Sequence, residues 1–128
     1  MATFFIADDT EGKLQMLKKF VEQSGIATTI LEARTSEEAK GVIDTHAIDA
    51  AFIDYEIPTE NGPAIIAHLK SVQPEARIAL VSASDSPTYQ ENALDAGAEA
   101  CLCTSYAEDT VVDDVLSILE KWKIELEG

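Results

Sequence analysis

The stretch Phe4-Phe5-Ile6-Ala7-Asp8-Asp9 places two adjacent aspartates directly after a run of four apolar residues. An uninterrupted apolar run that stops at charged residues is typical of a strand covered on both faces, as in a parallel sheet. The run is far too short to span a bilayer, which needs ~20 residues. No basic segment precedes it, as one would in a signal peptide. We therefore interpret it as a buried strand that ends in two carboxylates.

Four further apolar runs follow, and helical patterns lie between them. The runs are residues 28–33, 50–53, 78–81 and 100–103. Helix signals between the runs are Leu14, Leu17 and Val21 before Ser24-Gly25, a capping box at Thr35–Glu38, Gly62-Pro63, Ser86-Pro87, and Val111, Val115, Ile118 and Trp122. Strand and helix thus alternate five times, which predicts a parallel sheet with right-handed crossovers. We expect one α/β domain over residues 1–128, a flavodoxin-like (βα)5 fold of strand order 2-1-3-4-5, with residues 28–33 at an edge.

The composition is that of an acidic globular protein. The 128 residues include 24 acidic and 9 basic side chains, for a net charge of −15. This balance argues against direct nucleic-acid binding, which depends on Lys and Arg, and favours a metal cation, a basic partner surface or solubility. The only cysteines, Cys101 and Cys103, are expected to be packed thiols, because a zinc site needs more ligands.

The predicted strand order brings acidic residues together. In open α/β sheets the functional crevice lies beyond the carboxyl ends of the strands where their order reverses, here between strands one and three. Asp8 and Asp9 follow strand one and Asp54 follows strand three, while strand four ends in Ser82-Ala83-Ser84. Crowded carboxylates repel one another, which raises at least one pKa unless a cation such as Mg²⁺ neutralises them.

A carboxylate nucleophile suits such a pocket. His46 and His68 lie within helical patterns, away from the strand ends, so the pocket has no evident general base. A carboxylate that forms an acyl phosphate is then the natural chemistry. Each feature also has a structural explanation, since an Asp-Asp pair after a strand often only caps a helix.

Several motifs together resemble those of response regulator receiver domains, the CheY-like family. The resemblance rests on Asp8-Asp9, on Asp54 with Ile57-Pro58 behind it, on Gly62, on the strand 78–83 ending in Ser-Ala, and on Gly97-Ala98. By this resemblance Asp54 is the phosphoacceptor, and Mg²⁺ is held by Asp9, Asp54 and the backbone carbonyl of Glu56, with Asp8 acting through water. Ser82 and the backbone N–H of Ala83 would bind the phosphoryl oxygens.

The resemblance also implies partners and a location. The phosphoryl donor would be a sensor histidine kinase or a phosphotransfer protein, and the chain would catalyse at most its own phosphorylation and dephosphorylation. No output domain follows the last predicted helix, so we expect signalling through a downstream protein partner. The implied protein is cytoplasmic, a monomer or weak homodimer, without direct contact to nucleic acid or membrane.

Two positions depart from the family pattern. Cys101 stands where the family has an aromatic switch residue, and Thr104-Ser105 replaces a Lys-Pro pair. Thr104 offers no charge to a phosphoryl group, and no other Lys or Arg is placed by the sequence to replace the family lysine. These departures leave a second hypothesis open, in which the chain is a degenerate receiver that binds proteins independently of phosphate.

Overall fold

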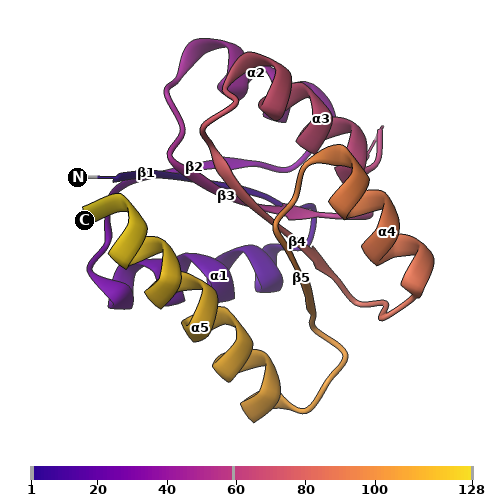
Figure 1. Cartoon of the computed structure of the whole chain (residues 1–128). Helices are drawn as coiled ribbons and strands as arrows, with labels where there is room; N and C mark the ends of the chain where they lie inside the picture. The colour runs from indigo at the N-terminus through magenta and orange to yellow at the C-terminus, as the bar shows by residue number, and fades with distance from the viewer. Residues whose placement is uncertain (1, 59, 128) are drawn as a thin grey trace.

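The computed structural model describes residues 2–58 and 60–127, in which five strands alternate with five helices (Figure 1). The elements are β1 (Ala2–Ala7), α1 (Glu11–Ser24), β2 (Ala27–Ala33), α2 (Ser36–Thr45), β3 (Ala50–Asp54), α3 (Gly62–Val72), β4 (Arg77–Ser82), α4 (Pro87–Ala96), β5 (Ala100–Cys103) and α5 (Glu108–Glu127). None of the helices described is both long and apolar enough to cross a membrane.

The sheet has the predicted topology. Its order is β2-β1-β3-β4-β5, and all neighbouring strands are parallel. The register pairs Phe4 with Ala50 and Ala7 with Ile53, so β1 and β3 end level with each other. Asp8 and Asp54 follow these last paired residues, and the register therefore sets both carboxylates at the same edge of the sheet.

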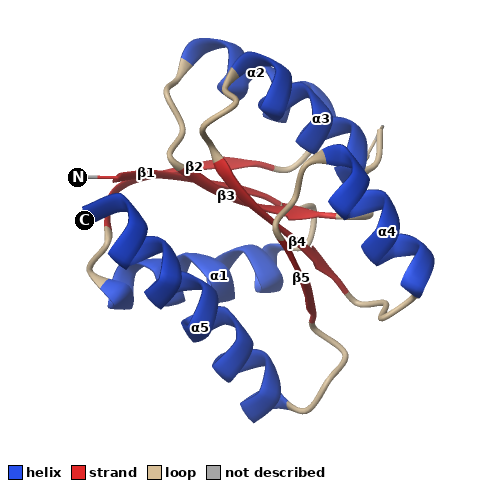
Figure 2. Cartoon of the chain, in the orientation of Figure 1, coloured by secondary structure: helices blue, strands red, loops and turns tan. Residues whose placement is uncertain are grey.

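Side chains alternate between two helical layers, because successive residues of a strand point to opposite faces. Phe4 and Ile6 pack in the core against α1 and α5, whereas Phe5 and Ala7 pack in the core against α2, α3 and α4. Figure 2 shows the sheet between these two layers. Phe52 belongs to the α1–α5 core, so Asp54, two residues later on the same strand, is directed to the α1–α5 side.

Local signals set the helix boundaries as the sequence predicts. The Thr35 hydroxyl accepts a hydrogen bond from the Glu38 N–H at 3.1 Å, which caps α2. Gly25 ends α1 with a φ of 71°, a left-handed conformation that glycine adopts without strain. At α3 the cap is Asn61, whose side chain accepts from the Ala64 N–H at 3.1 Å. The predicted starts at Gly62-Pro63 and Ser86-Pro87 are both confirmed.

Trp122 joins the last helix to the centre of the sheet. Its side chain is fully buried, and its ring centroid lies 6.0 Å from that of Phe4 and 5.2 Å from that of Phe52. The indole N–H donates to Glu99 Oε1 at 2.8 Å, so the polar atom of this buried ring has a partner. Trp122 therefore packs inside the domain and is not part of its surface.

Truncation of this side chain tests how strongly α5 depends on it. We expect Trp122→Ala to lower the free energy of unfolding by about 3–5 kcal/mol, because it leaves a cavity among aromatic rings and removes one of the hydrogen-bond donors to Glu99. Ile124→Ala lies two residues on, where the side chain is 67% exposed, and serves as the matched control with a change within about 0.5 kcal/mol. Urea titrations followed by far-UV circular dichroism measure both, and equal losses would contradict the packing argument.

Candidate functional site

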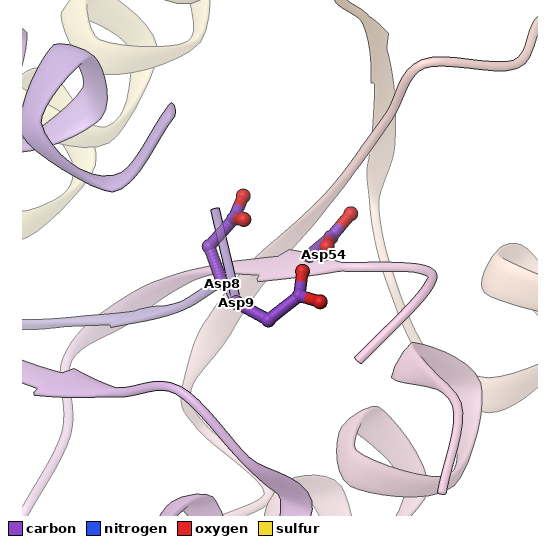
Figure 3. A group of neighbouring side chains, drawn as sticks. All are labelled: Asp8, Asp9 and Asp54. Carbon is purple, nitrogen blue, oxygen red and sulfur yellow. The ribbon is translucent and has the colours of Figure 1, made fainter. Parts of the chain in front are cut away.

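Three carboxylates meet at the carboxyl end of the sheet (Figure 3). Asp8 and Asp9 follow β1 and Asp54 is the last residue of β3, and one oxygen from each lies within 4.8 Å of the others. Asp8 and Asp54 are buried, with 0% and 4% of their surface exposed, while Asp9 is exposed. The structure therefore brings together the three acids that the sequence places at the switch point.

Asp8 is held by the backbone on one side and lacks a hydrogen bond on the other. The Thr10 N–H donates to Asp8 Oδ1 at 2.8 Å. Its other oxygen, Oδ2, is the one buried side-chain polar atom in residues 2–58 and 60–127 that is recorded without a hydrogen-bond partner. A buried carboxylate oxygen without a donor is costly, and it is satisfied by a cation. This oxygen and the donor set of three carboxylates fit a hard divalent ion.

Lys13 is the functional residue that the sequence reasoning missed. It lies in the first turn of α1, and its Nζ donates to Asp54 Oδ1 at 3.0 Å and lies 3.5 Å from Asp8 Oδ2. The structure thus places a lysine beside Asp54 and Asp8 that the sequence analysis does not identify. A signal was present, because Lys13 lies one turn before the buried Leu17 and thus on the helix face that covers the sheet.

Burial dominates the electrostatics of these groups. It raises the pKa of Asp54 to about 6, with the Lys13 hydrogen bond opposing and the charge of Asp8 adding to the rise. Burial also raises the pKa of Asp8, against the Thr10 hydrogen bond and the Lys13 charge. The direction agrees with the sequence expectation, but desolvation is a larger cause than the mutual repulsion on which that expectation was based.

Burial lowers the pKa of Lys13, but the neighbouring carboxylates raise it by more. Desolvation by itself lowers the pKa of a buried ammonium, but the hydrogen bond and charge of Asp54, together with the charge of Asp8, leave the pKa of Lys13 above its usual value. Lys13 is therefore a permanent cation at the edge of the acidic cluster.

The loop after Asp54 is connected to α4 through aromatic side chains. The rings of Tyr55 and Tyr89 stack, with centroids 3.8 Å apart and planes within 4°. The Tyr89 hydroxyl donates to Glu56 Oε1 at 3.0 Å, and Asn92 Nδ2 donates to the Tyr55 hydroxyl at 3.1 Å. These contacts direct the Glu56 side chain towards α4. Glu56 and Asp9 line one shallow groove of about 360 Å³.

Ser82 and Thr104 lie on the next two strands. Ser82 ends β4 directly after Val81, the register partner of Asp54, and its hydroxyl accepts from the Ser84 N–H at 3.0 Å. Thr104 follows β5 and donates to the Ser82 carbonyl through its N–H at 2.8 Å and its hydroxyl at 3.3 Å. The hydroxyl of Thr104 is thus tied to the β4 backbone. Ala83 follows Ser82 and is exposed at this rim.

Cys101 leaves space where the family has an aromatic ring. Cys101 lines a small cavity of about 50 Å³ together with Ser82, Tyr89 and Tyr106. Cys101 and Cys103 are free thiols, as the sequence predicts.

Gly62 packs directly against the peptide of Asp54. Its N–H donates to the Tyr55 carbonyl at 2.7 Å, and a Cβ placed on it would lie 2.3 Å from the Asp54 carbonyl oxygen and 2.9 Å from Tyr55 Cα. Backbone atoms cannot yield as a flexible side chain can, so this position requires glycine. The glycine therefore keeps the loop after β3 folded under the acidic cluster.

Comparison with known proteins identifies the family. The family model for the response regulator receiver domain matches residues 4–117. The chain belongs to the response regulator receiver domain family. The transcriptional regulatory protein NarL of Mycobacterium tuberculosis is 31% identical to this receiver domain over 93 residues, which is 73% of this chain and 43% of NarL. The chain thus spans less than half the length of that relative.

Solved structures agree with the assignment. The signal receiver domain of response regulator NarL from M. tuberculosis is 26% identical, with a TM-score of 0.78 over 93% of this receiver domain and 96% of that one. A Burkholderia pseudomallei response regulator, solved with a phosphorylated aspartic acid, calcium ion and citrate, superposes with a TM-score of 0.76. It shares 22% identity and covers 100% of this chain and 75% of its own, so it supports the fold alone.

The close approach at Gly62 gives a test of the loop geometry. We expect Gly62→Ala to lower the free energy of unfolding by about 1–3 kcal/mol, because the methyl group forces the Asp54–Tyr55 peptide to move. Gly41→Ala in α2 is the matched control, since nothing lies within 4 Å of a Cβ there, and it should stabilise the helix by about 0.5–1 kcal/mol. Urea titration measures both variants, and a neutral Gly62→Ala would contradict the close packing of Gly62 on this peptide.

The raised pKa of Asp54 predicts a pH-dependent penalty in metal-free protein. An unfolded Asp titrates near 3.8 and folded Asp54 near 6, so the folded state binds more protons between these values and loses stability as pH rises through them. At about 1.36 kcal/mol per pKa unit, the full penalty above pH 6 is on the order of 3 kcal/mol.

Asp54→Asn removes this titration. In EDTA, its stability relative to the wild type should increase as the pH rises from about 4 to about 7, as measured by urea titration at several pH values. Asp54→Ser, which is also neutral, should show the same pH slope. A difference between variant and wild type that does not change with pH would show that Asp54 titrates normally.

Proposed function

We propose that this receiver domain is a phosphoacceptor switch in which Asp54 accepts a phosphoryl group. The observation that carries the proposal is the position of Asp54, a buried carboxylate at the end of β3 that faces Lys13 and lies within 4.8 Å of Asp8 and Asp9. Membership of the receiver family supports it. An intact acceptor site favours this function over a phosphate-independent interaction module.

The chemistry proposed is a direct displacement at phosphorus. A carboxylate oxygen of Asp54 attacks the phosphorus, the bond to the donor's leaving group breaks, and that group departs with the bonding electrons. From acetyl phosphate the leaving group is acetate, and no proton transfer is needed. From a phosphohistidine it is the imidazole nitrogen, which can take a proton from water. Asp54 must be ionised to attack, and with a pKa of about 6 it is ionised at neutral pH.

The proposed metal ion is Mg²⁺, held by Asp9, Asp54 and the backbone carbonyl of Glu56, with Asp8 alongside. The oxygen-only donor set supports a hard divalent cation, and so does Asp8 Oδ2, which is buried and recorded without a hydrogen bond. When bound, such an ion neutralises negative charge on the attacking and transferred oxygens. The hydroxyl of Ser82 and the N–H of Ala83, at the adjoining end of β4, are the proposed donors to the phosphoryl oxygens.

The proposed partners follow from this chemistry. A sensor histidine kinase or phosphotransfer protein supplies the phosphoryl group, and a downstream protein reads the phosphorylated state, in the cytoplasm. The Tyr55–Tyr89 stack supports α4 as part of the output surface, because it connects the residue after Asp54 to that helix. We propose residues 1–128 as one domain, a monomer or weak homodimer, with no direct contact to nucleic acid.

Phosphorylation by a small donor tests the proposal. The protein is incubated with acetyl phosphate with and without Mg²⁺, and its intact mass is followed. We expect an adduct of one phosphoryl group that requires Mg²⁺ and is absent from Asp54→Asn.

Two comparisons make the result specific. Asp44→Asn, an exposed carboxylate on α2 that pairs with His68, should form the adduct like the wild type. An adduct that persists in Asp54→Asn would place the acceptor elsewhere. A folded wild-type protein that forms no adduct with acetyl phosphate or with a phosphorylated histidine donor would overturn the proposed function.

A further inference from the structure

We propose that Lys13 supplies the positive charge for the phosphoryl group on Asp54, from α1 rather than from the loop after β5. This inference rests on the proposed function, and it assigns Lys13 a role in the same site. The geometry that suggests it is direct, since Lys13 Nζ donates to Asp54 Oδ1 at 3.0 Å and lies 3.5 Å from Asp8 Oδ2. One ammonium thus bridges the two buried carboxylates.

The position that carries a lysine in the family lacks a charge here. Thr104 stands there, and its N–H and hydroxyl both bond the Ser82 carbonyl. Thr104 and Lys13 nevertheless line one groove, of about 740 Å³, between α1 and the segment leading into α5. Lys13 lies on the α1 side of this groove, and Thr104 lies on the side of the segment between β5 and α5. A positive charge carried by α1 can therefore act near the same groove as a charge at position 104 would.

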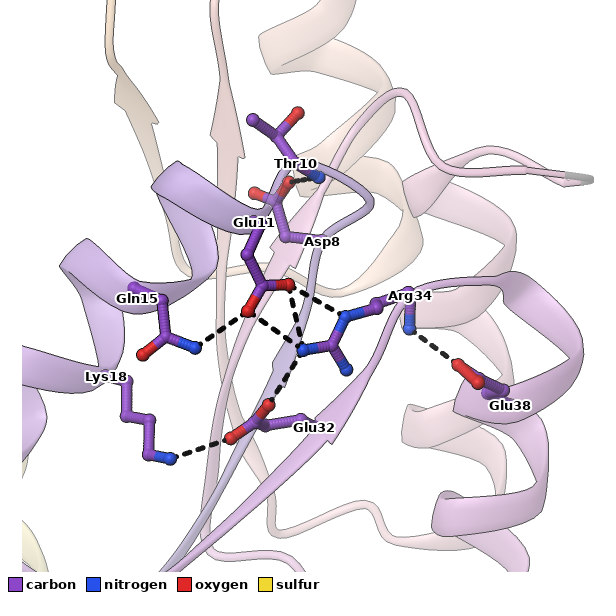
Figure 4. Close-up of polar contacts among 8 residues, drawn as sticks. All are labelled: Asp8, Thr10, Glu11, Gln15, Lys18, Glu32, Arg34 and Glu38. Atoms are coloured by element: carbon purple, nitrogen blue, oxygen red, sulfur yellow. Dashed lines mark hydrogen bonds and ion pairs between the residues drawn. The ribbon is translucent and has the colours of Figure 1, made fainter.

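Five other cations of the described chain form ion pairs away from Asp54. Figure 4 shows Arg34 paired with Glu11 and Glu32, and Lys18 paired with Glu32. The remaining recorded ion pairs of Lys and Arg are Lys40 with Glu60, Arg77 with Glu125, and Lys121 with Glu99 and Glu125. Among residues 2–58 and 60–127, Lys13 is the one cation recorded in an ion pair with Asp54.

The location of Lys13 is unfavourable for the helix itself. The first turn of a helix carries the positive end of its dipole, so a cation there destabilises the helix. Lys13 is also only 17% exposed, and burial of an ammonium is costly unless it is paired. A lysine with both disadvantages is explained by the carboxylates it meets, and not by the stability of α1.

The ammonium suits phosphoryl binding as well as carboxylate pairing. It has three N–H donors on a flexible four-carbon chain, so it can keep Asp8 as a partner while it donates to an oxygen of the transferred group. Phosphorylation replaces the single negative charge of the Asp54 carboxylate, which Lys13 contacts, with close to two negative charges on the oxygens of the attached phosphoryl group. The contact therefore strengthens as the phosphoryl group arrives, which is the condition for an effect on rate.

Lys13→Gln is the decisive variant, since it keeps a polar side chain and removes the charge. We expect the initial rate of acetyl phosphate modification and the affinity for beryllofluoride, a phosphoryl mimic, to fall about tenfold to hundredfold, the range for loss of a charge-assisted hydrogen bond. Intact mass and fluorine NMR measure these quantities. Mg²⁺ affinity, measured by calorimetry without beryllofluoride, should be unchanged or tighter, because a competing cation has been removed.

Matched variants isolate the charge. Lys13→Arg should recover much of both losses, whereas Lys19→Gln, an exposed lysine on the same helix, should behave like the wild type. Circular dichroism at the assay temperature confirms that each variant is folded.

The outcomes separate the two proposals. A wild type that forms the adduct, with Lys13→Gln within twofold of it or faster, overturns the role of Lys13 and leaves the phosphoacceptor intact. Equal losses in Lys13→Gln and Lys13→Arg also overturn it, because charge is then not the property that matters. A folded wild type that forms neither adduct nor beryllofluoride complex overturns the proposed function and this inference together.

Discussion

The buried carboxylates of Asp8 and Asp54 lie close together, out of contact with solvent that would screen their charges. The pairing of Ala7 with Ile53 makes β1 and β3 end level, and this register cannot slip without turning Phe4, Phe5 and Phe52 away from their cores. Asp8 and Asp54 must therefore share a buried site, and in a low-dielectric setting their repulsion is poorly screened. The contacts around them offset this repulsion, from the Thr10 N–H on Asp8 to the ammonium of Lys13 between the two acids.

Asp54 and the loop after it make contacts on different faces of the sheet. Asp54 takes its counter-charge from the α1–α5 side, through Lys13, whereas the loop that follows it packs on the α2–α4 side. That loop is fixed by two short backbone contacts, from the Tyr55 N–H to the Val81 carbonyl and from the Gly62 N–H to the Tyr55 carbonyl. Packed side chains thus connect the residue after Asp54 directly to the ring of Tyr89 on α4.

The sequence predicts what depends on local pattern and on topology. Apolar runs, capping residues and Gly-Pro signals locate the elements, and the strand order then brings Asp8, Asp9 and Asp54 to one edge without any knowledge of side-chain packing. It does not predict contacts that depend on how a helix lies over the sheet. The reach of Lys13 to Asp54 and the stack of Tyr55 on Tyr89 both join separate elements, and their geometry depends on the placement of α1 and α4. The same limit explains why burial, which needs the packed structure, was underestimated as the cause of the Asp54 pKa.

If the positive charge at Asp54 comes from Lys13 on α1, the proposed phosphorylation depends on a different part of the chain than if the charge came from the loop after β5. Asp8, Asp9 and Lys13 lie within six consecutive residues at the end of β1, so the acids and their counter-charge are positioned by one strand–helix junction. A charge carried after β5 would instead depend on how the edge strand and its loop pack. With Lys13 in this role, Thr104 is free to bond the β4 backbone, and Cys101 can leave a small cavity beside Ser82 and Tyr89. The two departures from the family pattern are therefore compatible with an intact acceptor site, because neither residue is then required to carry the charge.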